Sequence, residues 1–289
     1  MSLTRRDFLK ASAVIAAAFG AKVDALAAEG GLSVIWLQAQ SCTGCSVSLL
    51  NSIYYDTIDS LVVNTLDLNF HPNLMAAAGM LARSAAEAAF SKGNYVLVVE
   101  GAVPTGASGT YCNLWPGLTA ADGVKAYAAK TPYVMAVGTC AAYGGVAAAP
   151  PNPTQAIDVQ TLIGTTKRVI RIPGCPSHPD WIVGTVAYML KYGTVPVLDA
   201  EGRPKMFFEK TVHDRCPLKG TTPARALGQY GCMKELGCRG PVTKADCPVR
   251  RWNTGAANTY GTNWCIGTRV PCHGCASSKF NELRPFFKS

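Results

Sequence analysis

Twelve cysteines in a chain of 289 residues are the feature that most restricts how this chain can fold. Cys42 with Cys45 and Cys272 with Cys275 have the C-x-x-C spacing, which lets two thiolates face one metal ion or one cluster. Seven of the twelve lie in the last third of the chain: Cys216, Cys232, Cys238, Cys247, Cys265, Cys272 and Cys275. The cysteines therefore predict cross-links, either covalent or through metal, in two separate parts of the chain.

Short β-branched runs alternate with helical patterns through the first two thirds of the sequence. The runs cover residues 32–37, 61–68, 95–99, 133–137 and 168–172. Helical stretches cover residues 73–90 and the segment after Pro179. Strands that alternate with helices predict a flavodoxin-like α/β fold with a doubly wound parallel sheet, which we assign to residues 28–192.

Four cysteines stand directly after strand-like runs. Cys42 and Cys45 follow the first run, Cys140 follows residues 133–137, and Cys175 follows residues 168–172. The carboxyl ends of parallel strands share one edge of the sheet, where open α/β folds build their binding sites. The spacing therefore predicts a site with four cysteine ligands at that edge.

The composition and the secondary-structure pattern of the sequence change after residue 192. Pro196, Gly202 and Pro204 mark a connector, and the remainder is rich in Gly, Pro and Cys but poor in strand patterns. Such a segment lacks the apolar periodicity for a core of its own. We expect residues 193–289 to form a smaller, irregular domain that folds around metal.

The first residues have the features of an export signal. Arg5 and Arg6 are followed by Phe8 and Lys10, an apolar run and a small-residue cleavage site ending at Ala27. This order predicts a twin-arginine signal peptide over residues 1–27 and export of the folded protein to the periplasm. No later stretch reaches eighteen apolar residues, so no membrane anchor is expected on this chain.

The formal charge of +9 does not indicate a nucleic-acid-binding protein, because the basic residues are dispersed and no run of five occurs. Loss of residues 1–27 leaves about +7, and if eleven of the cysteines bind metal clusters as thiolates, the net charge falls to about +2.

Disulfides, zinc and iron–sulfur clusters are the three roles open to these cysteines. Disulfide frameworks are typical of chains too small to bury a core, which does not describe the first two thirds here. Zinc is harder to exclude, since His213 and Cys216 would suit a tetrahedral site. Eleven cysteines and one histidine divide into three groups of four, which favours clusters, but residue types alone leave zinc open.

The local motifs resemble the small subunits of nickel–iron hydrogenases. The motifs that carry the resemblance are Ser41-Cys42-Thr43-Gly44-Cys45-Ser46, Glu100-Gly101-Ala102-Val103-Pro104, Gly138-Thr139-Cys140, Pro173-Gly174-Cys175-Pro176, His213 with Cys216, Gly237-Cys238-Arg239-Gly240-Pro241, and Cys272-His273-Gly274-Cys275. They occur in the order of the family and cover nearly all of the chain that follows the signal peptide.

The resemblance implies three 4Fe–4S clusters with twelve ligands. The implied proximal ligands are Cys42, Cys45, Cys140 and Cys175; the distal ligands are His213, Cys216, Cys232 and Cys238; and the medial ligands are Cys247, Cys265, Cys272 and Cys275. Most relatives have proline at the position of Cys265 and a three-iron medial cluster. Cys265 therefore implies a full medial cubane, as in the nickel–iron–selenium branch.

The resemblance also implies the partners. A large subunit would carry the nickel–iron site and catalyse hydrogen oxidation or proton reduction, while this chain would pass electrons to a periplasmic c-type cytochrome. Cys272 and Cys275 could be mistaken for the nickel motif of the large subunit, which reads D-P-C-x-x-C-x-x-H. Val270 and Ser278 stand where that motif needs aspartate and histidine, so no catalytic residue is expected on this chain. An independent ferredoxin is disfavoured because no C-x-x-C-x-x-C run occurs.

A few polar residues remain outside these ligand sets. Glu100 ends a strand-like run near the implied proximal site and is a candidate proton relay or subunit-interface residue, although a carboxylate satisfied by local donors is an equal alternative. Cys112 is the leftover cysteine, for which we expect a buried, inert thiol. His71, His178 and His273 are expected to be structural.

Overall fold

The computed structural model describes residues 31–252 and 263–283. The predicted signal peptide, residues 1–27, lies outside these described residues. Within them, we find no helix that is long and apolar enough to cross a membrane.

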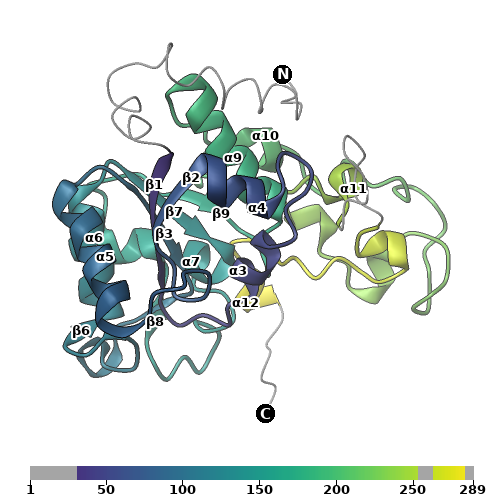
Figure 1. The fold of residues 1–289 in the computed structure, drawn as a ribbon. Coiled ribbons are helices and arrows are strands. Elements are labelled where there is room, and N and C mark those ends of the chain that lie inside the picture. The colour runs from purple at the N-terminus through teal and green to yellow at the C-terminus, as the bar shows by residue number, and fades with distance from the viewer. Residues whose placement is uncertain (1–30, 253–262, 284–289) are drawn as a thin grey trace.

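A five-stranded parallel sheet forms the centre of the molecule (Figure 1). Its strands are β1 (Leu32–Gln38), β2 (Leu66–Phe70), β3 (Val96–Glu100), β7 (Tyr133–Val137) and β9 (Ile170–Ile172). The spatial order is β2-β1-β3-β7-β9, so the direction of winding reverses between β1 and β3. This is the flavodoxin-like order with its topological switch point, and it confirms the predicted fold class.

Two short antiparallel pairs accompany the main sheet. They are β4 (Val103–Pro104) with β8 (Ala156–Ile157), and β5 (Asn113–Trp115) with β6 (Leu118–Thr119). The helices of the first part are α3 (Gly44–Leu49), α4 (Ile58–Ser60), η1 (Leu61–Thr65), α5 (Gly79–Lys92), η2 (Gly106–Gly109), α6 (Ala120–Lys130), α7 (Gly138–Tyr143), α8 (Val159–Ile163) and α9 (Pro179–Tyr192). Those of the second part are α10 (Lys205–Phe208), η3 (Met233–Leu236), η4 (Gly240–Val242), α11 (Cys247–Arg250), η5 (Ile266–Thr268) and α12 (Phe280–Leu283).

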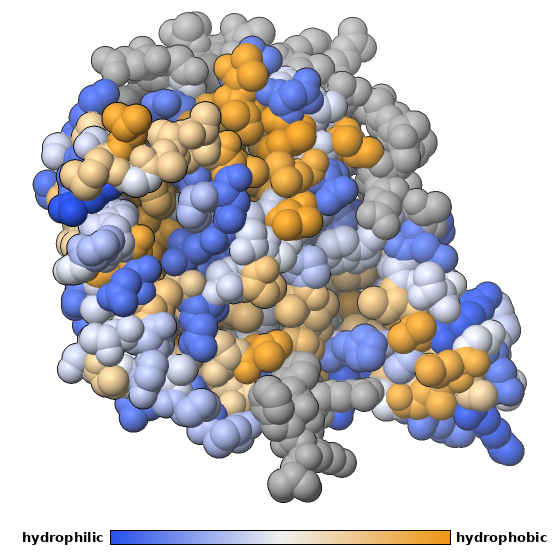
Figure 2. All heavy atoms as spheres, turned by 60° about the horizontal axis from the view of Figure 1, so that its bottom comes forward, coloured by the Kyte–Doolittle hydropathy of each residue, from blue (hydrophilic) through white to orange (hydrophobic). Residues whose placement is uncertain are grey.

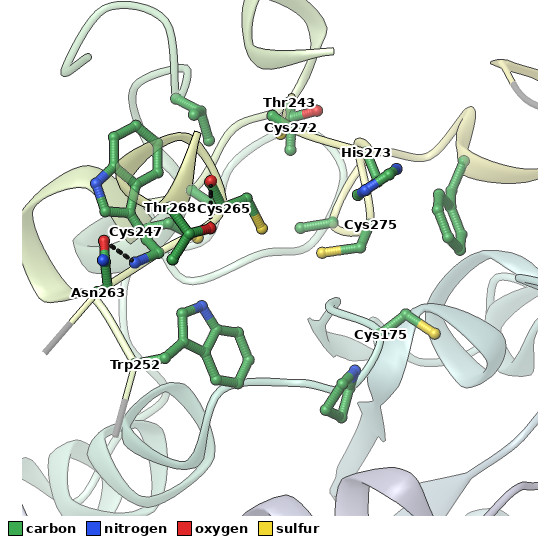
Figure 3. Close-up of a pocket in the computed structure, with 16 residues that line it drawn as sticks. Cys175, Thr243, Cys247, Trp252, Asn263, Cys265, Thr268, Cys272, His273 and Cys275 are labelled. Atoms are coloured by element: carbon green, nitrogen blue, oxygen red, sulfur yellow. Dashed lines mark hydrogen bonds between the residues drawn. The ribbon is translucent and has the colours of Figure 1, made fainter. Parts of the chain in front are cut away.

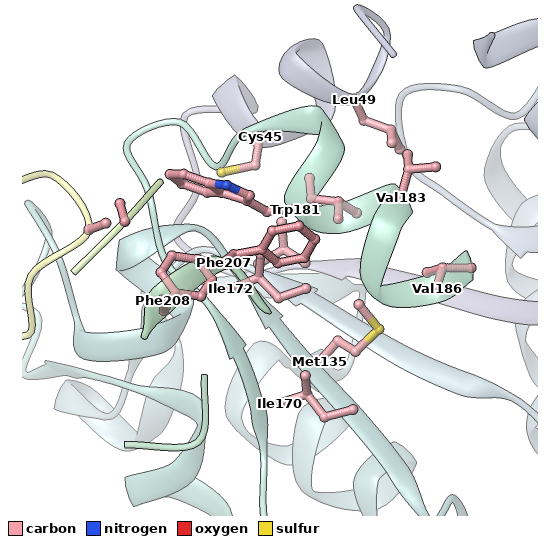
Figure 4. Packing of buried hydrophobic residues seen from close by; sticks show 14 of the residues in the cluster. Cys45, Leu49, Met135, Ile170, Ile172, Trp181, Val183, Val186, Phe207 and Phe208 are labelled. Atoms are coloured by element: carbon pink, nitrogen blue, oxygen red, sulfur yellow. The ribbon is translucent and has the colours of Figure 1, made fainter. Parts of the chain in front are cut away.

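Alternate side chains of each strand enter two apolar layers. In β1, Ile35 and Leu37 pack in the layer that contains α5 and α6, whereas Val34 and Trp36 pack in the layer that contains α9. Figure 4 shows the second layer, where Trp181 of α9 lies between Cys45 and the strand residues. Each fully buried aliphatic side chain contributes roughly 1.5–3 kcal/mol, so these layers stabilise the sheet without any metal.

The second layer continues beyond the sheet. Phe207, Phe208, Met233, Trp264 and Ile266 belong to the same buried cluster as the residues of α9. The C-terminal segment is therefore packed onto one face of the sheet. The proposed boundary between residues 192 and 193 coincides with the end of α9, where Gly193 adopts φ 64° and closes the helix.

Two expected elements differ from the structure. The run over residues 61–68 was expected as a strand, but Leu61–Thr65 is a π-helical turn and the strand begins at Leu66. Val63 is 76% exposed, so this β-branched segment follows the turn rather than the sheet. The helix expected over residues 73–90 begins at Gly79 instead, because His71 accepts a hydrogen bond from the backbone of Asn73 and holds a turn there.

Candidate metal centres

The expected sheet-edge site lies at the switch point of the sheet. Cys45 is in α3 directly after β1, and Cys140 is in α7 directly after β7. The amide of Thr139 donates to the carbonyl of Gly174 over 2.8 Å, which joins α7 to the loop that carries Cys175. The geometry of the parallel sheet thus brings together three segments that are far apart in the sequence.

The thiols of this group lie within electrostatic range of one another. Burial raises the pKa of the Cys45 thiol well above its usual value, and Glu100, Cys140 and Cys175 raise it further. The pKa of Cys175 rises to about 12, chiefly through burial and then through Cys140, Cys275 and Cys42. Such thiols ionise only beside positive charge, and coordination to iron supplies that charge. The donor set therefore fits an iron–sulfur cluster.

Three glycines leave room around these sulfurs. A Cβ on Gly138 would lie 2.5 Å from Cys45 Sγ, and one on Gly145 would lie 2.7 Å from Cys140 Sγ. A Cβ on Gly44 would lie 3.1 Å from Cys42 Sγ. Gly138 and Gly145 also have φ of +85° and +52°, so both space and backbone conformation require glycine there.

Glu100 is buried at this site, with an exposed fraction of 2%. Its carboxylate accepts hydrogen bonds from five donors: Trp36 Nε1, Gln38 Nε2, Ser41 Oγ, the amide of Cys45, and Ser46 Oγ. One of these donors is the backbone of a candidate ligand. Glu100 therefore fixes the loop that carries Cys42 and Cys45, and four of its donors come from side chains to which sequence reasoning assigned no role.

His71 extends this network. Its Nδ1 accepts from the amide of Asn73, so Nε2 carries the proton and faces Ser46 Oγ at 3.2 Å. Burial lowers its pKa to about 4, so the ring is neutral near pH 7. Sequence reasoning expected a structural histidine here but could not connect it with Glu100.

A cavity of about 590 Å³ lies between the sheet edge and the C-terminal segment (Figure 3). Cys247, Cys265, Cys272 and Cys275 line it, and Cys175 lies at its border. In Figure 3 the sulfurs of Cys265 and Cys275 point toward each other across the cavity, whereas the sulfur of Cys175 points away.

The thiols of the cavity are also shifted by burial. Burial raises the pKa of Cys247 well above its usual value, with Cys275, Cys272 and Cys265 adding to the shift. The pKa of Cys272 rises to about 12. Trp264, only 7% exposed, lines the cavity among other apolar side chains. A cavity with a mainly apolar wall and four thiols fits a cluster.

A third group lies in the C-terminal segment beyond this cavity. The amide of Cys216 donates to the carbonyl of His213, and the amide of His213 donates to Gly240, beside Cys238. Burial raises the pKa of Cys216, and Cys238 and Cys232 raise it further. These contacts bring together the four residues expected as distal ligands.

All twelve cysteines are free thiols, which rules out the disulfide alternative in this structure. In the described residues no three His, Cys, Asp or Glu side chains are placed to share one metal ion. The ligands of a cubane bind different irons and therefore stand further apart than the ligands of one ion.

An ion-pair network fixes the segment that carries Cys247. Arg250 Nε lies 2.9 Å from Asp246 Oδ2, and Arg250 Nη1 lies 3.0 Å from Asp180 Oδ2 of α9. Trp181 Nε1 donates to Asp246 over 2.7 Å. The network joins α9 to α11, and sequence reasoning missed it because its residues are up to 70 positions apart.

The remaining residues have other surroundings. Cys112 is half-buried against the layer that contains α6, and burial raises its pKa. His178 caps α9 by accepting from the amide of Asp180, and its Nε2 donates to the carbonyl of Arg251. His273 is exposed at the border of the cavity.

Comparisons with known proteins identify relatives of both parts of the chain. Residues 42–189 match the family described as NADH ubiquinone oxidoreductase, 20 Kd subunit, and residues 208–288 match the family of the C-terminal part of the NiFe/NiFeSe hydrogenase small subunit. The periplasmic NiFeSe hydrogenase small subunit of Desulfomicrobium baculatum is 37% identical, with 99% of each chain covered. The periplasmic NiFe hydrogenase small subunit of Solidesulfovibrio fructosivorans is 38% identical over 99% of this chain and 93% of that protein.

A solved structure shows the same fold. The NiFeSe hydrogenase of Desulfovibrio vulgaris Hildenborough superposes with a TM-score of 0.81 at 38% identity, covering 91% of this chain and 99% of that one. The fold and its cysteine-lined sheet edge therefore define an iron–sulfur electron-transfer protein. The chain belongs to the small subunits of nickel–iron and nickel–iron–selenium hydrogenases.

Proposed function

We propose that this chain relays electrons through three 4Fe–4S clusters between the nickel–iron site of a large subunit and an external carrier, during hydrogen oxidation or proton reduction. The proposed ligands are Cys42, Cys45, Cys140 and Cys175 for the proximal cluster, Cys247, Cys265, Cys272 and Cys275 for the medial cluster, and His213, Cys216, Cys232 and Cys238 for the distal cluster. When bound, the clusters supply one-electron redox chemistry.

The pattern of interactions among the thiols carries this proposal. Within each proposed set, the thiols shift one another's pKa. Between sets, Cys175 interacts with Cys275, and Cys265 interacts with Cys238. The proximal and medial sets, and the medial and distal sets, are therefore close enough for their thiols to interact electrostatically. Such proximity supports the transfer of electrons from one cluster to the next.

Iron and sulfide analysis of the anaerobically purified holoprotein tests the cluster content. Three cubanes require about twelve irons per chain. A content near eleven, with the magnetic resonance signal of an oxidised three-iron cluster, would contradict the medial assignment, and no iron would contradict the proposal as a whole.

Cys265 offers a sharper test of the medial cluster. The Cys265→Pro variant is expected to lose one iron and to show the paramagnetic signal of an oxidised three-iron cluster, which an oxidised cubane lacks. Cys112→Ser is the matched control, because Cys112 belongs to none of the three sets, and it should keep the full iron content.

The surface proposed to bind the large subunit lies beside the proximal set. Val47 in α3 is 55% exposed, and Leu50, directly after α3, is 44% exposed; both are close to Cys45 in the sequence. Apolar side chains exposed beside a buried site are typical of protein interfaces. Co-purification of a larger, nickel-containing chain tests this, and Val47→Asp is expected to weaken it.

Glu100 is proposed as a proton relay or as an interface residue, in addition to its structural hydrogen bonds. Glu100→Gln separates the two roles. A relay predicts slower turnover with an increased solvent isotope effect in an intact heterodimer, whereas an interface role predicts reduced co-purification. Unchanged turnover and unchanged assembly would leave Glu100 only its structural contacts.

We further propose periplasmic location, export by the twin-arginine route, and a c-type cytochrome as the carrier. The paired Arg5 and Arg6 support export, and the names of two relatives place those proteins in the periplasm. The double variant Arg5→Lys with Arg6→Lys is expected to accumulate in the cytoplasm. Normal export of that variant would contradict the route.

A further inference from the structure

Positive charge is concentrated around the proposed distal site. Residues 211–244 contain six basic side chains against two acidic ones: Arg215, Lys219, Arg225, Lys234, Arg239 and Lys244 against Asp214 and Glu235. By contrast, residues 31–120 contain only two basic side chains against five acidic ones. The two ends of the described structure therefore differ in the sign of their charge.

The basic side chains lie beside the distal ligands. Lys219 follows Cys216, and its amide donates to the carbonyl of Cys216 over 3.1 Å. Lys234 is two residues after Cys232 and is exposed. Arg225 is exposed in a loop whose base is closed by hydrogen bonds between Cys232 and both Thr222 and Ala224.

Acidic side chains offset little of this charge. Asp214 lies 3.8 Å from Lys219, and both side chains are about half exposed, so the pair is screened by water. A cluster held by three thiolates and one histidine would contribute only about −1. The surface around the distal site therefore stays positive in the holoprotein.

The loop also presents apolar surface at its tip. Leu227 is 66% exposed and Tyr230 is 68% exposed. Arg269 lies over the Tyr230 ring, with its guanidinium carbon 4.7 Å from the centroid. Figure 2 shows hydrophobic residues on the lobe at the right, bordered by hydrophilic ones. Tyrosine and arginine are enriched among the interface residues that contribute most of the binding energy, and such residues cluster near the centre of an interface.

We propose that this surface, formed by Lys219, Arg225, Leu227, Tyr230 and Lys234, is the docking site for an electron-carrier protein with an acidic docking face. The inference rests on the proposed function, because it takes the His213 set as the exit of the electrons. Each hydrogen molecule oxidised at the partner subunit yields two protons and two electrons. The electrons leave singly and reduce two molecules of a one-electron carrier, while the protons pass to water.

The test compares two carriers that differ only in charge. Mitochondrial cytochrome c is lysine-rich, and succinylation replaces its lysine charges with carboxylates while keeping the haem. We expect the holoenzyme under hydrogen to reduce succinylated cytochrome c about tenfold faster at low salt, and salt should diminish this preference. A preference for the native, basic cytochrome, or equal rates at all salt concentrations, would overturn the proposal.

Charge reversal locates the site. The triple variant Lys219→Glu, Arg225→Glu and Lys234→Glu is expected to invert the preference. Lys125→Glu, an exposed lysine of α6, is the matched control and should retain it. Tyr230→Ala should slow reduction of the succinylated carrier without altering its salt dependence. Retained preference in the triple variant would place docking elsewhere.

Two further measurements separate this docking site from its alternatives. The enzymatic exchange of isotopes between deuterium gas and water needs the heterodimer but no external carrier. Its absence would therefore count against the proposed function rather than against the docking site. Co-sedimentation with phosphatidylglycerol vesicles tests an anionic membrane as the occupant. Suppose that the protein binds vesicles, that the triple variant does not, and that the two cytochromes are reduced at equal rates. This result would show that the surface binds a membrane and not a carrier protein.

Discussion

The sheet region and the C-terminal region hold cysteines by different means. In residues 31–192 the strands bury alternate side chains in two apolar layers, and the ligands follow the strand ends. In the described part of residues 193–289 no helix exceeds four residues, and strand pairing is limited to isolated bridges such as that between Pro223 and Cys232. The comparison predicts that burial alone can fold the sheet, whereas the C-terminal region also needs metal to fold.

Removal of iron should give the largest difference between the two regions. In apoprotein prepared by chelation under oxidising conditions, amides of residues 211–252 and 263–283 are expected to lose most of their protection from hydrogen exchange, because turns without ligated thiolates have little to hold them. The amides of β1, β3 and β7 should remain protected. Hydrogen exchange with mass spectrometry compares the holoprotein with the apoprotein. Equal loss in both regions would show that the sheet also depends on iron.

Breaking the ion-pair network between the regions should give the next largest effect. Arg250→Met leaves Asp180 and Asp246 buried without their cation, which costs about 3–5 kcal/mol for a buried pair of this kind. Urea unfolding of the holoprotein measures the change.

Arg251→Met is the matched control for this variant. It makes the same chemical change one position along the chain, on a side chain that is exposed, and it should alter stability by no more than about 0.5 kcal/mol. Similar losses in the two variants would argue against the network.

A methyl group at the sheet-edge site should have a smaller and local effect. Gly138→Ala places a Cβ against Cys45 Sγ, and relief of that overlap costs about 1–3 kcal/mol. The variant is expected to lose iron from the proximal set alone.

Gly117→Ala separates backbone strain from the overlap with sulfur. Gly117 has nearly the same φ, +83°, but a Cβ there meets nothing within 4 Å. Its iron content should remain complete. Iron loss in this control as well would mean that general destabilisation, rather than contact with Cys45, explains the Gly138 result.

The smallest effect is a pH dependence from His178, which joins the two regions. Burial lowers its pKa to about 3, with the charge of Arg250 acting in the same direction. The unfolded chain therefore binds a proton below about pH 6.5 while the folded chain does not, so stability falls as pH decreases from about 6.5 toward 3. The slope is at most about 1.4 kcal/mol per pH unit.

Urea unfolding at pH 7.0 and 5.5 measures this slope. His178→Asn keeps a side chain able to cap α9 but removes the titrating group, so its slope should be smaller. An unchanged slope would assign the pH dependence to other groups.

The sequence predicted correctly those features that depend on residues close together in the chain. The β-branched runs predicted the parallel sheet, and the cysteines after those runs predicted convergence at one edge, because both follow from chain direction in a parallel sheet. The run over residues 61–68 misled because β-branched residues also occur in turns, and only the packing of its neighbours placed Leu61–Thr65 outside the sheet.

The sequence by itself determined the fold class, the family and the residue types available to hold clusters. Tertiary structure alone decided that Glu100 accepts five hydrogen bonds and that Arg250 joins α9 to α11. The reason is physical. Strand and motif patterns are set by neighbours in the chain, whereas buried ion pairs and surface charge depend on which distant segments the fold places in contact.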